Sequence, residues 1–146
     1  MQIIDFDKLN KEEKELVQAA EKAMKTAYTP YSNFPVGAAI LTESGKIITG
    51  SNVENVSYSL TICAERVAVF RANAIGERNF KKIAVVTSKK EISGPCGACR
   101  QVLFEFSQIS GRDFLVIMTN LKKEKVVLAK ISELLPFGFK PKDLLL

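Results

Sequence analysis

The sequence has 146 residues, of which 47% are hydrophobic and 25% charged, and its formal net charge is +5 at pH 7. This balance is typical of a folded globular protein and excludes a disordered tail, so we expect a single domain over residues 1–146. The longest apolar runs, such as 114–118, are far shorter than the roughly 20 residues that a membrane-spanning helix needs, so no membrane partner is expected.

The positive charge does not by itself indicate a nucleic-acid partner. The lysines are spread along the chain, with pairs at 81–82, 89–90 and 122–123, and none of these pairs is interleaved with the aromatic residues that stack on single-stranded bases. The first residues lack the basic region and apolar block of a secretory leader. We therefore expect a cytoplasmic protein, in which most thiols are reduced. Three cysteines cannot all pair within one chain, and metal binding fits this number better.

The chain begins with a short lead and an amphipathic helix. Apolar residues recur at helical spacing from about Asp7 or Asn10 to about Tyr28. Asn10 and Glu13 have the spacing of a capping box, in which each side chain binds the backbone N–H of the other residue. Pro30 ends the helix, because the residue before a proline is restricted to extended conformations.

A β-hairpin is predicted next, followed by two polar residues. Val36–Leu41 and Lys46–Ser51 read as strands joined by a turn at 43–45. If the second strand continues as extended chain, Asn52 and Glu54 point to one side, because side chains alternate along a strand. These two polar groups then face the same space.

The rest of the chain predicts three further helices and three further strands. Thr61 is the expected N-cap of a helix from about Cys63 to Ile75, and Pro95 is expected in the first turn of a helix that ends near Ser107. The strands are Lys82–Thr87, Phe114–Thr119 and Lys125–Ala129, and a short helix follows near Ser132–Leu135. Because the link 120–124 is too short for a crossover helix, the last two strands should be antiparallel.

These elements predict an α/β fold with a mixed five-stranded sheet and helices packed on it. The apolar end Leu144-Leu145-Leu146 suggests either a partner subunit or docking on the chain's own core.

The three cysteines lie at the starts of the two internal helices. Cys96 and Cys99 form a Cys-x-x-Cys pair, which is a common half of a zinc site, and Cys63 lies at the start of the other helix. The chain contains no histidine, which excludes Ser-His and Cys-His catalytic couples. Three protein ligands leave the fourth position of a tetrahedral Zn²⁺ open to water, as in catalytic zinc sites.

Charged residues beside these cysteines suggest how such a centre would react. Three thiolates on Zn²⁺ sum to a charge of minus one, which weakens the metal as a Lewis acid. Arg66 and Arg100, each directly following a ligand segment, are candidates to donate hydrogen bonds to the sulfurs. Glu65 is the candidate proton shuttle, because a carboxylate beside the metal's water is what proton transfer requires.

Each of these residues also has a structural interpretation. Cys63 alone is more often a buried small hydrophobe than a metal ligand, and the Cys-x-x-Cys pair alone is compatible with redox chemistry. A fourth ligand from another chain would make the zinc structural. Glu65 fits a solvated helix carboxylate, and Asn52 with Glu54 fits ordinary turn capping. The joint occurrence of these motifs at two helix starts favours the catalytic interpretation.

The motifs resemble those of a known enzyme family. Cys63-Ala64-Glu65 together with Pro95-Cys96-Gly97-Ala98-Cys99 resembles the signature of zinc deaminases in which cysteine replaces histidine. The longer strings at 34–39, 52–55, 61–66 and 95–103 resemble cytidine deaminase of the small homotetrameric type. The resemblance runs from about residue 23 to beyond residue 136, nearly the whole chain.

The resemblance implies a three-layer α/β/α fold, bound Zn²⁺, and hydrolytic deamination of cytidine and deoxycytidine in pyrimidine salvage. Cys63, Cys96 and Cys99 would bind the metal, and Glu65 would take a proton from its water, deliver it to N3 and later protonate the departing amine. Other residues would contact substrate: Phe34 and the backbone of Ala64 at the base, Asn52 and Glu54 at the ribose, and Tyr58 and Phe137 in sites of neighbouring subunits. The string at 137–139 varies from the commoner wording, so Phe139 is an alternative to Phe137.

Three other functions remain as alternatives. A deaminase of the antibiotic blasticidin would share the zinc chemistry, but the intact string 52–55 argues against it, because the sugar of that antibiotic lacks the same hydroxyl pattern. Nucleic-acid editing is supported only by the positive net charge of the chain. A zinc-stabilised binding module would keep the metal without catalysis.

Overall fold

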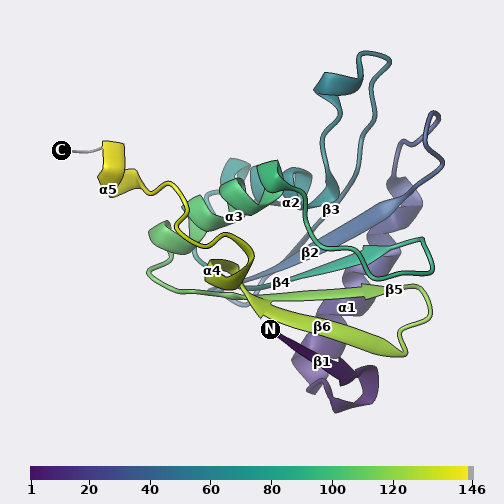
Figure 1. The fold of residues 1–146 in the computed structure, drawn as a ribbon, viewed down its shortest axis with the longest axis horizontal. Helices are drawn as coiled ribbons and strands as arrows, with labels where there is room; N and C mark the ends of the chain where they lie inside the picture. The colour runs from purple at the N-terminus through teal and green to yellow at the C-terminus, as the bar shows by residue number, and fades with distance from the viewer. Residues whose placement is uncertain (145–146) are drawn as a thin grey trace.

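The protein forms one mixed β-sheet covered by helices on both faces (Figure 1), and the computed structural model describes residues 1–144. The strands are β1 (Gln2–Asp5), β2 (Val36–Thr42), β3 (Ile47–Ser51), β4 (Phe80–Thr87), β5 (Leu115–Asn120) and β6 (Lys125–Lys130). Their order across the sheet is β1-β6-β5-β4-β2-β3. The central pair β4 and β5 is parallel and every other neighbouring pair is antiparallel.

The sheet has six strands, so the prediction of five is wrong. The additional strand is β1, which pairs antiparallel with β6 and places Ile3 opposite Val127. β1 has only four residues, and Ile3 is 70% exposed, so this segment has too little apolar periodicity to be recognised as a strand. Only the free edge of β6 gives it a partner. The predicted hairpin of β2 and β3 and the antiparallel pairing of β5 with β6 are confirmed.

The helices divide between the two faces of the sheet. The α-helices are α1 (Lys11–Ala23), α2 (Ala64–Ala74), α3 (Gly97–Ile109), α4 (Ile131–Leu134) and α5 (Pro141–Leu144), and the 3-10 segments are η1 (Phe6–Lys8), η2 (Met24–Thr26) and η3 (Tyr58–Leu60). Because side chains alternate along a strand, each strand contributes residues to both faces of the sheet. On one face Ala39 and Ala84 pack with Leu16 of α1, and on the other Ile40 and Val85 pack with α2 and α3. The result is three layers, α/β/α.

Local capping explains where α1 begins, and a change of helix type explains where it ends. The predicted capping box is confirmed, because Asn10 Oδ1 accepts from Glu13 N at 2.9 Å and Glu13 Oε2 accepts from Asn10 N at 3.1 Å. The helix ends at Ala23 and not near Tyr28 as predicted, since the chain tightens into η2. The Thr26 hydroxyl donates to the Ala23 carbonyl at 3.0 Å and so satisfies a group at the helix end.

Two glycines set how closely the helices approach the sheet. A Cβ atom on Gly37 would lie 1.9 Å from the Ala20 carbonyl oxygen of α1. A Cβ atom on Gly50 would lie 2.4 Å from the Ala68 backbone nitrogen of α2. Glycine at position 50 therefore lets α2 lie directly against β3. This contact sets the distance between the first turns of α2 and the sheet.

Two segments extend from the layered body in Figure 1: the connection from β3 to α2, which carries η3, and the C-terminal segment with α5. Leu144 is 71% exposed, and the other two leucines of the apolar end, Leu145 and Leu146, lie outside the described residues. Among the described helices none is long and apolar enough to cross a bilayer.

Candidate metal centre and substrate cavity

Two helix starts bring the three cysteines together. Cys63 and Cys96 are the N-cap residues of α2 and α3, with φ angles of −70° and −66°, and neither side chain caps its helix. Their sulfurs are therefore free to bind elsewhere. Cys99 lies in the first turn of α3. The predicted start of α2 near Cys63 is confirmed to within one residue, but the N-cap is Cys63 and not Thr61. Pro95 lies just before the N-cap of α3 and not in its first turn as predicted.

The three sulfurs fit a single tetrahedral metal ion. All three Sγ atoms lie within 4.8 Å of one another, and those of Cys63 and Cys96 are 3.8 Å apart. Two thiolates about 2.3 Å from a tetrahedral Zn²⁺ are themselves about 3.8 Å apart. The three cysteines are free thiols and not disulfides. The donor set and its spacing therefore match a zinc site with three protein ligands.

The surroundings favour the thiolate form of Cys63. The pKa of this thiol falls to about 5, because Cys99 donates a hydrogen bond to it and the Arg66 guanidinium donates to its sulfur at 3.5 Å. The same hydrogen bond raises the pKa of Cys99, which acts as the donor. The positive ends of the α2 and α3 helix dipoles act in the same direction as Arg66, by favouring negative charge on sulfurs at their N-termini.

Arg100 does not have the contact that was expected. Its Nε donates to the Pro95 carbonyl at 2.7 Å and its Nη1 donates to the Leu134 carbonyl at 3.0 Å. The side chain therefore turns away from the sulfurs and fastens the segment before Cys96 to the end of α4. The prediction of a sulfur contact is wrong for Arg100, whereas Arg66 makes one.

Glu65 lies beside the cysteines as a buried acid. The residue is only 4% exposed, and among the described residues Oε2 has no hydrogen-bond partner. Burial raises the pKa of its carboxyl to about 7, and the negative charge of Cys63 adds to this effect. A carboxyl that titrates near neutral pH can both accept and return a proton.

A cavity of about 300 Å³ opens directly onto this centre. Its size is at the lower end of the range for small-molecule sites. Cys63, Cys96, Ala64 and Glu65 line one part of it, and Phe34, Asn52 and Glu54 line another. The charged residues among its described lining are Glu54 and Glu65, so the cavity is acidic.

Asn52 and Glu54 face this shared cavity, as alternation predicted, while Val53 between them is 45% exposed. Both polar side chains also hold the neighbouring loop. Asn52 Oδ1 accepts from Val36 N at 2.8 Å and its Nδ2 donates to the Phe34 carbonyl at 2.9 Å. An amide group has two N–H donors and two lone pairs, so Asn52 keeps one N–H and one lone pair for a ligand.

The Glu54 carboxylate is anchored in a similar way. Oε2 accepts from the backbone N–H groups of Tyr31 and Ser32 at 3.0 and 3.2 Å, and Oε1 accepts from the Ser32 hydroxyl. The Ser32 hydroxyl is the main cause that holds the pKa of Glu54 below its usual range. Glu54 is therefore a fixed anion at neutral pH.

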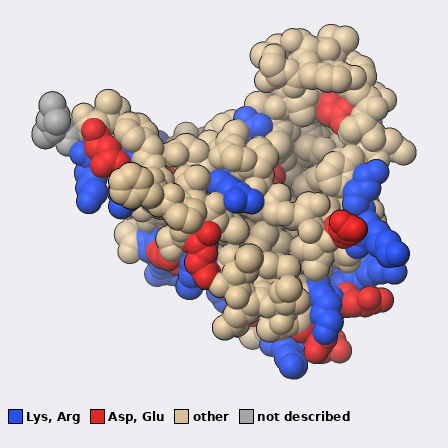
Figure 2. Space-filling model, in the orientation of Figure 1, with Lys and Arg blue, Asp and Glu red and all other residues tan. Residues whose placement is uncertain are grey.

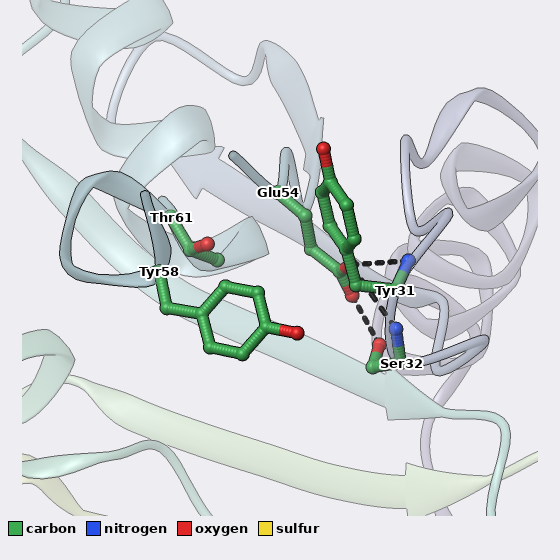
Figure 3. Close-up of a pocket in the computed structure, with 5 residues that line it drawn as sticks. All are labelled: Tyr31, Ser32, Glu54, Tyr58 and Thr61. Atoms are coloured by element: carbon green, nitrogen blue, oxygen red, sulfur yellow. Dashed lines mark hydrogen bonds between the residues drawn. The ribbon is translucent and has the colours of Figure 1, made fainter. Parts of the chain in front are cut away.

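A second depression of about 370 Å³ continues from the cavity, and Figure 3 shows its five lining residues. Ser32, Glu54 and Thr61 line both spaces, while Tyr31 and Tyr58 line only this outer one. The two tyrosine rings are 5.7 Å apart, and Tyr58 is 73% exposed. Figure 2 shows the surface hollowed beside the projecting segment that carries Tyr58.

Sequence reasoning missed several residues of these cavities. The sequence predicts the segment 31–35 as a loop without assigning a role to Tyr31 or Ser32, and it predicts Val85 and Thr87 of β4 only as strand residues. The signal available for the β4 residues was alternation, because every second residue of this strand faces α2 and α3.

Phe137 stands apart from both cavities within one chain. It is fully exposed and has a positive φ of 55°. The neighbouring Phe139 is 59% exposed, and Gln101 Nε2 donates to its carbonyl at 3.0 Å. Phe137 is thus the more available of the two rings to a neighbouring molecule.

Comparisons with known proteins agree on one family. Residues 10–112 match the family model described as cytidine and deoxycytidylate deaminase zinc-binding region. This match spans more than half of the chain and includes the three cysteines and Glu65.

Individual relatives extend the likeness to nearly the full chain. A cytidine deaminase of Sporosarcina psychrophila is 47% identical over 88% of this chain and 92% of its own length. A probable cytidine deaminase of Dictyostelium discoideum is 43% identical over 94% of this chain and 90% of its own length. The crystal structure of cytidine deaminase from Burkholderia pseudomallei superposes with a TM-score of 0.80 at 45% identity, covering 86% of this chain and 98% of that one.

Proposed function

This chain belongs to the cytidine and deoxycytidylate deaminase family, and on that basis we propose that it hydrolyses cytidine and deoxycytidine to uridine and deoxyuridine, with release of ammonia. One observation carries this proposal: three sulfurs with the spacing of a zinc site and the buried Glu65 carboxyl share one cavity.

We propose that Cys63, Cys96 and Cys99 hold one Zn²⁺. When bound, the ion supplies Lewis-acid activation of the water that attacks the pyrimidine ring. The residues around the ion moderate the charge of the three thiolates. Arg66 contacts Cys63, and the two helix N-termini add partial positive charge.

Glu65 is the proposed proton carrier. It accepts a proton from the attacking water and delivers it to N3 of the ring. It then takes the second proton, from the hydroxyl group formed at C4, and passes it to the amino group as the bond from C4 to nitrogen breaks. Its raised pKa of about 7 supports this role, since neither the protonated nor the ionised form is strongly favoured near neutral pH. Its Oε2, without a partner in the protein, is available to the reacting groups.

The proposed substrate contacts divide between the base and the sugar. Phe34 and the backbone of Ala64 contact the base, and Asn52 and Glu54 bind ribose hydroxyls with the hydrogen-bonding capacity that the loop leaves free. The lining favours free nucleosides over nucleotides or nucleic acid, because Glu54, an anion at neutral pH, would repel a phosphate. Nucleoside deamination fits a role in pyrimidine salvage.

We also propose a homotetramer in which Tyr58 and Phe137 complete the sites of neighbouring subunits. Large hydrophobic side chains are exposed around Tyr58, including Val56 at 78% and Leu60 at 61%. Exposed apolar residues that gather on one segment are typical of interaction surfaces. The mass of the purified protein in sedimentation equilibrium tests this assembly.

An absorbance assay tests the proposed reaction. Conversion of cytidine to uridine changes the ultraviolet spectrum of the base, so mixing zinc-loaded protein with cytidine should give a steady absorbance change and one ammonia per uridine formed. A fully zinc-loaded protein that leaves both cytidine and deoxycytidine unchanged would refute the proposed function.

A further inference from the structure

Three buried side-chain polar atoms lack a hydrogen-bond partner within the described part of the chain, and all three are at this site. They are Glu65 Oε2, Arg66 Nε and Thr87 Oγ1. Buried polar groups in native proteins are nearly always paired, so each exception needs a reason. The proposed proton transfer explains why Glu65 Oε2 has no partner, and the thiolates explain why Arg66 lies here. Neither proton transfer nor metal binding explains the unpaired hydroxyl of Thr87.

Thr87 belongs to the strand floor of the cavity. It is the last residue of β4 and only 3% exposed. Alternation places it on the same face as Ile83 and Val85, which is the face that α2 and α3 cover. Thr87 lines the cavity with Val85, and its register partner on β2 is Val36, another lining residue.

An unpaired hydroxyl at position 87 would be energetically unfavourable if Thr87 had only a structural role. Valine has nearly the same shape and would fill the same space without leaving a polar group unpaired. The neighbouring floor residues Val36 and Val85 show that valine suits this environment. Rotation about χ1 moves the threonine hydroxyl from one staggered position to another, so a ligand in the cavity can bring the hydroxyl to the lining surface.

We propose that Thr87 is a further substrate-binding residue, whose hydroxyl forms a hydrogen bond with the pyrimidine nucleoside in the cavity. A hydroxyl both donates and accepts, and a pyrimidine ring carries a carbonyl acceptor and a ring nitrogen along its edge. Between the apolar side chains of Val36 and Val85, Thr87 gives this part of the floor its polar contact. The inference rests on the proposed function, because the ligand is a nucleoside.

The experiment compares nucleoside binding and stability in matched variants of the zinc-loaded protein. Uridine is the probe, since the product cannot be deaminated, and its Kd is measured by calorimetric titration alongside the urea midpoint of each ligand-free variant. Thr87→Val removes only the hydroxyl, and Thr87→Ser keeps it. Thr119→Val is the control, because Thr119 is fully buried on β5 and its hydroxyl donates to the Lys125 carbonyl at 2.8 Å.

Thr87→Val should raise the Kd for uridine about three- to tenfold, the worth of one neutral hydrogen bond, while its urea midpoint stays equal to or above that of the wild type. Thr87→Ser should bind within about twofold of the wild type. Thr119→Val should show the reverse pattern, with unchanged uridine binding and a lower urea midpoint, since it leaves the Lys125 carbonyl unpaired.

Equal uridine binding by Thr87→Val and the wild type would overturn this inference and leave the proposed function intact. Should Thr87→Val fail to fold, Thr87→Ala gives the same comparison of binding against Thr87→Ser. A wild-type protein that binds no uridine and does not deaminate cytidine would overturn the proposed function itself.

Discussion

The side-chain amide of Asn52 holds the backbone of Phe34, because its Nδ2 donates to the Phe34 carbonyl at 2.9 Å. The same amide accepts a hydrogen bond from Val36 N at 2.8 Å, so one side chain braces both ends of the turn into β2. Asn52 follows β3, and Phe34 precedes β2. The contact therefore fixes the position of Phe34, the aromatic residue of the cavity, relative to the end of β3, where the polar residues Asn52 and Glu54 lie.

Replacing Asn52 by alanine should weaken both the fold and substrate binding. Asn52→Ala leaves the Phe34 carbonyl and the Val36 N–H without their partner, at a cost of about 1–3 kcal/mol in unfolding free energy. The KM for cytidine should rise as well, since Phe34 loses its support. Urea unfolding and steady-state kinetics measure the two effects. Asn73→Ala is the control, because Asn73 is exposed on α2 and binds only Arg78. Equal effects of both substitutions would contradict the bracing role.

Glu54 should contribute to stability in a manner that depends on pH. Hydrogen bonds from Ser32 and Tyr31 hold the folded pKa of Glu54 below its unfolded value of about 4.3. Its contribution is therefore fully present above that unfolded value and is lost as the pH falls through the folded pKa. The urea midpoints of wild type and Glu54→Gln should differ by a constant amount from pH 8 to about pH 5 and converge in more acidic solution. A difference that shrinks between pH 8 and pH 6 would contradict the assignment.

Arg66 should matter for metal retention and Arg71 should not. Arg66 donates to Cys63 Sγ at 3.5 Å, whereas Arg71, on the same helix, donates to Thr49 of β3. Groups that hydrogen-bond to metal ligands typically change metal affinity or activity about 10- to 100-fold when removed. Competition with a chelator should show Arg66→Gln losing zinc at a lower chelator concentration than the wild type, and Arg71→Gln losing it at the wild-type concentration. Identical release from the two variants would show that Arg66 does not act on the centre.

Gly50 should be intolerant of even one added carbon. A Cβ atom would lie 2.4 Å from the Ala68 nitrogen and 2.6 Å from the Ala64 carbonyl oxygen, both in the backbone of α2. Because backbone cannot rotate away, Gly50→Ala should lower the unfolding free energy by about 1–3 kcal/mol or more, as overpacking does. Gly97→Ala is the matched control, since nothing lies within 4 Å of its added Cβ. A wild-type urea midpoint for Gly50→Ala would contradict the close helix–strand contact.

The sequence predicted features that depend on neighbours along the chain better than features that depend on distant partners. The capping box joins Asn10 to Glu13, three positions later, and was predicted correctly, as was the β2–β3 hairpin. β1 was missed because its strand character depends on the free edge of β6, which lies more than 120 residues away in the sequence. The N-cap of α2 and the start of α3 were misplaced because Thr61 and Pro95 have strong local preferences, whereas the cysteines after them take the N-cap position.

At the candidate site, too, features that depend on neighbours along the chain were predicted better than features that depend on distant residues. Spacing placed Cys96 and Cys99 on one helix turn and suggested Cys63 as their partner, and the structure brings the three sulfurs within 4.8 Å. Adjacency to the cysteines in sequence suggested that Arg66 and Arg100 would both donate hydrogen bonds to the sulfurs. Arg100 instead donates to the Leu134 carbonyl at the end of α4. The contribution of Thr87 to the cavity depends on which face of β4 lies against α2 and α3 and which against α1, and composition does not encode that choice.

The central claim is that a three-cysteine zinc centre and Glu65 together deaminate a pyrimidine nucleoside. The most direct measurement determines zinc per chain and cytidine turnover on the same preparations of wild type and Glu65→Gln, with Cys96→Ser as the metal-binding control. The account predicts one zinc per chain and turnover for the wild type, one zinc per chain without turnover for Glu65→Gln, and neither for Cys96→Ser. Wild-type turnover by zinc-loaded Glu65→Gln would contradict it.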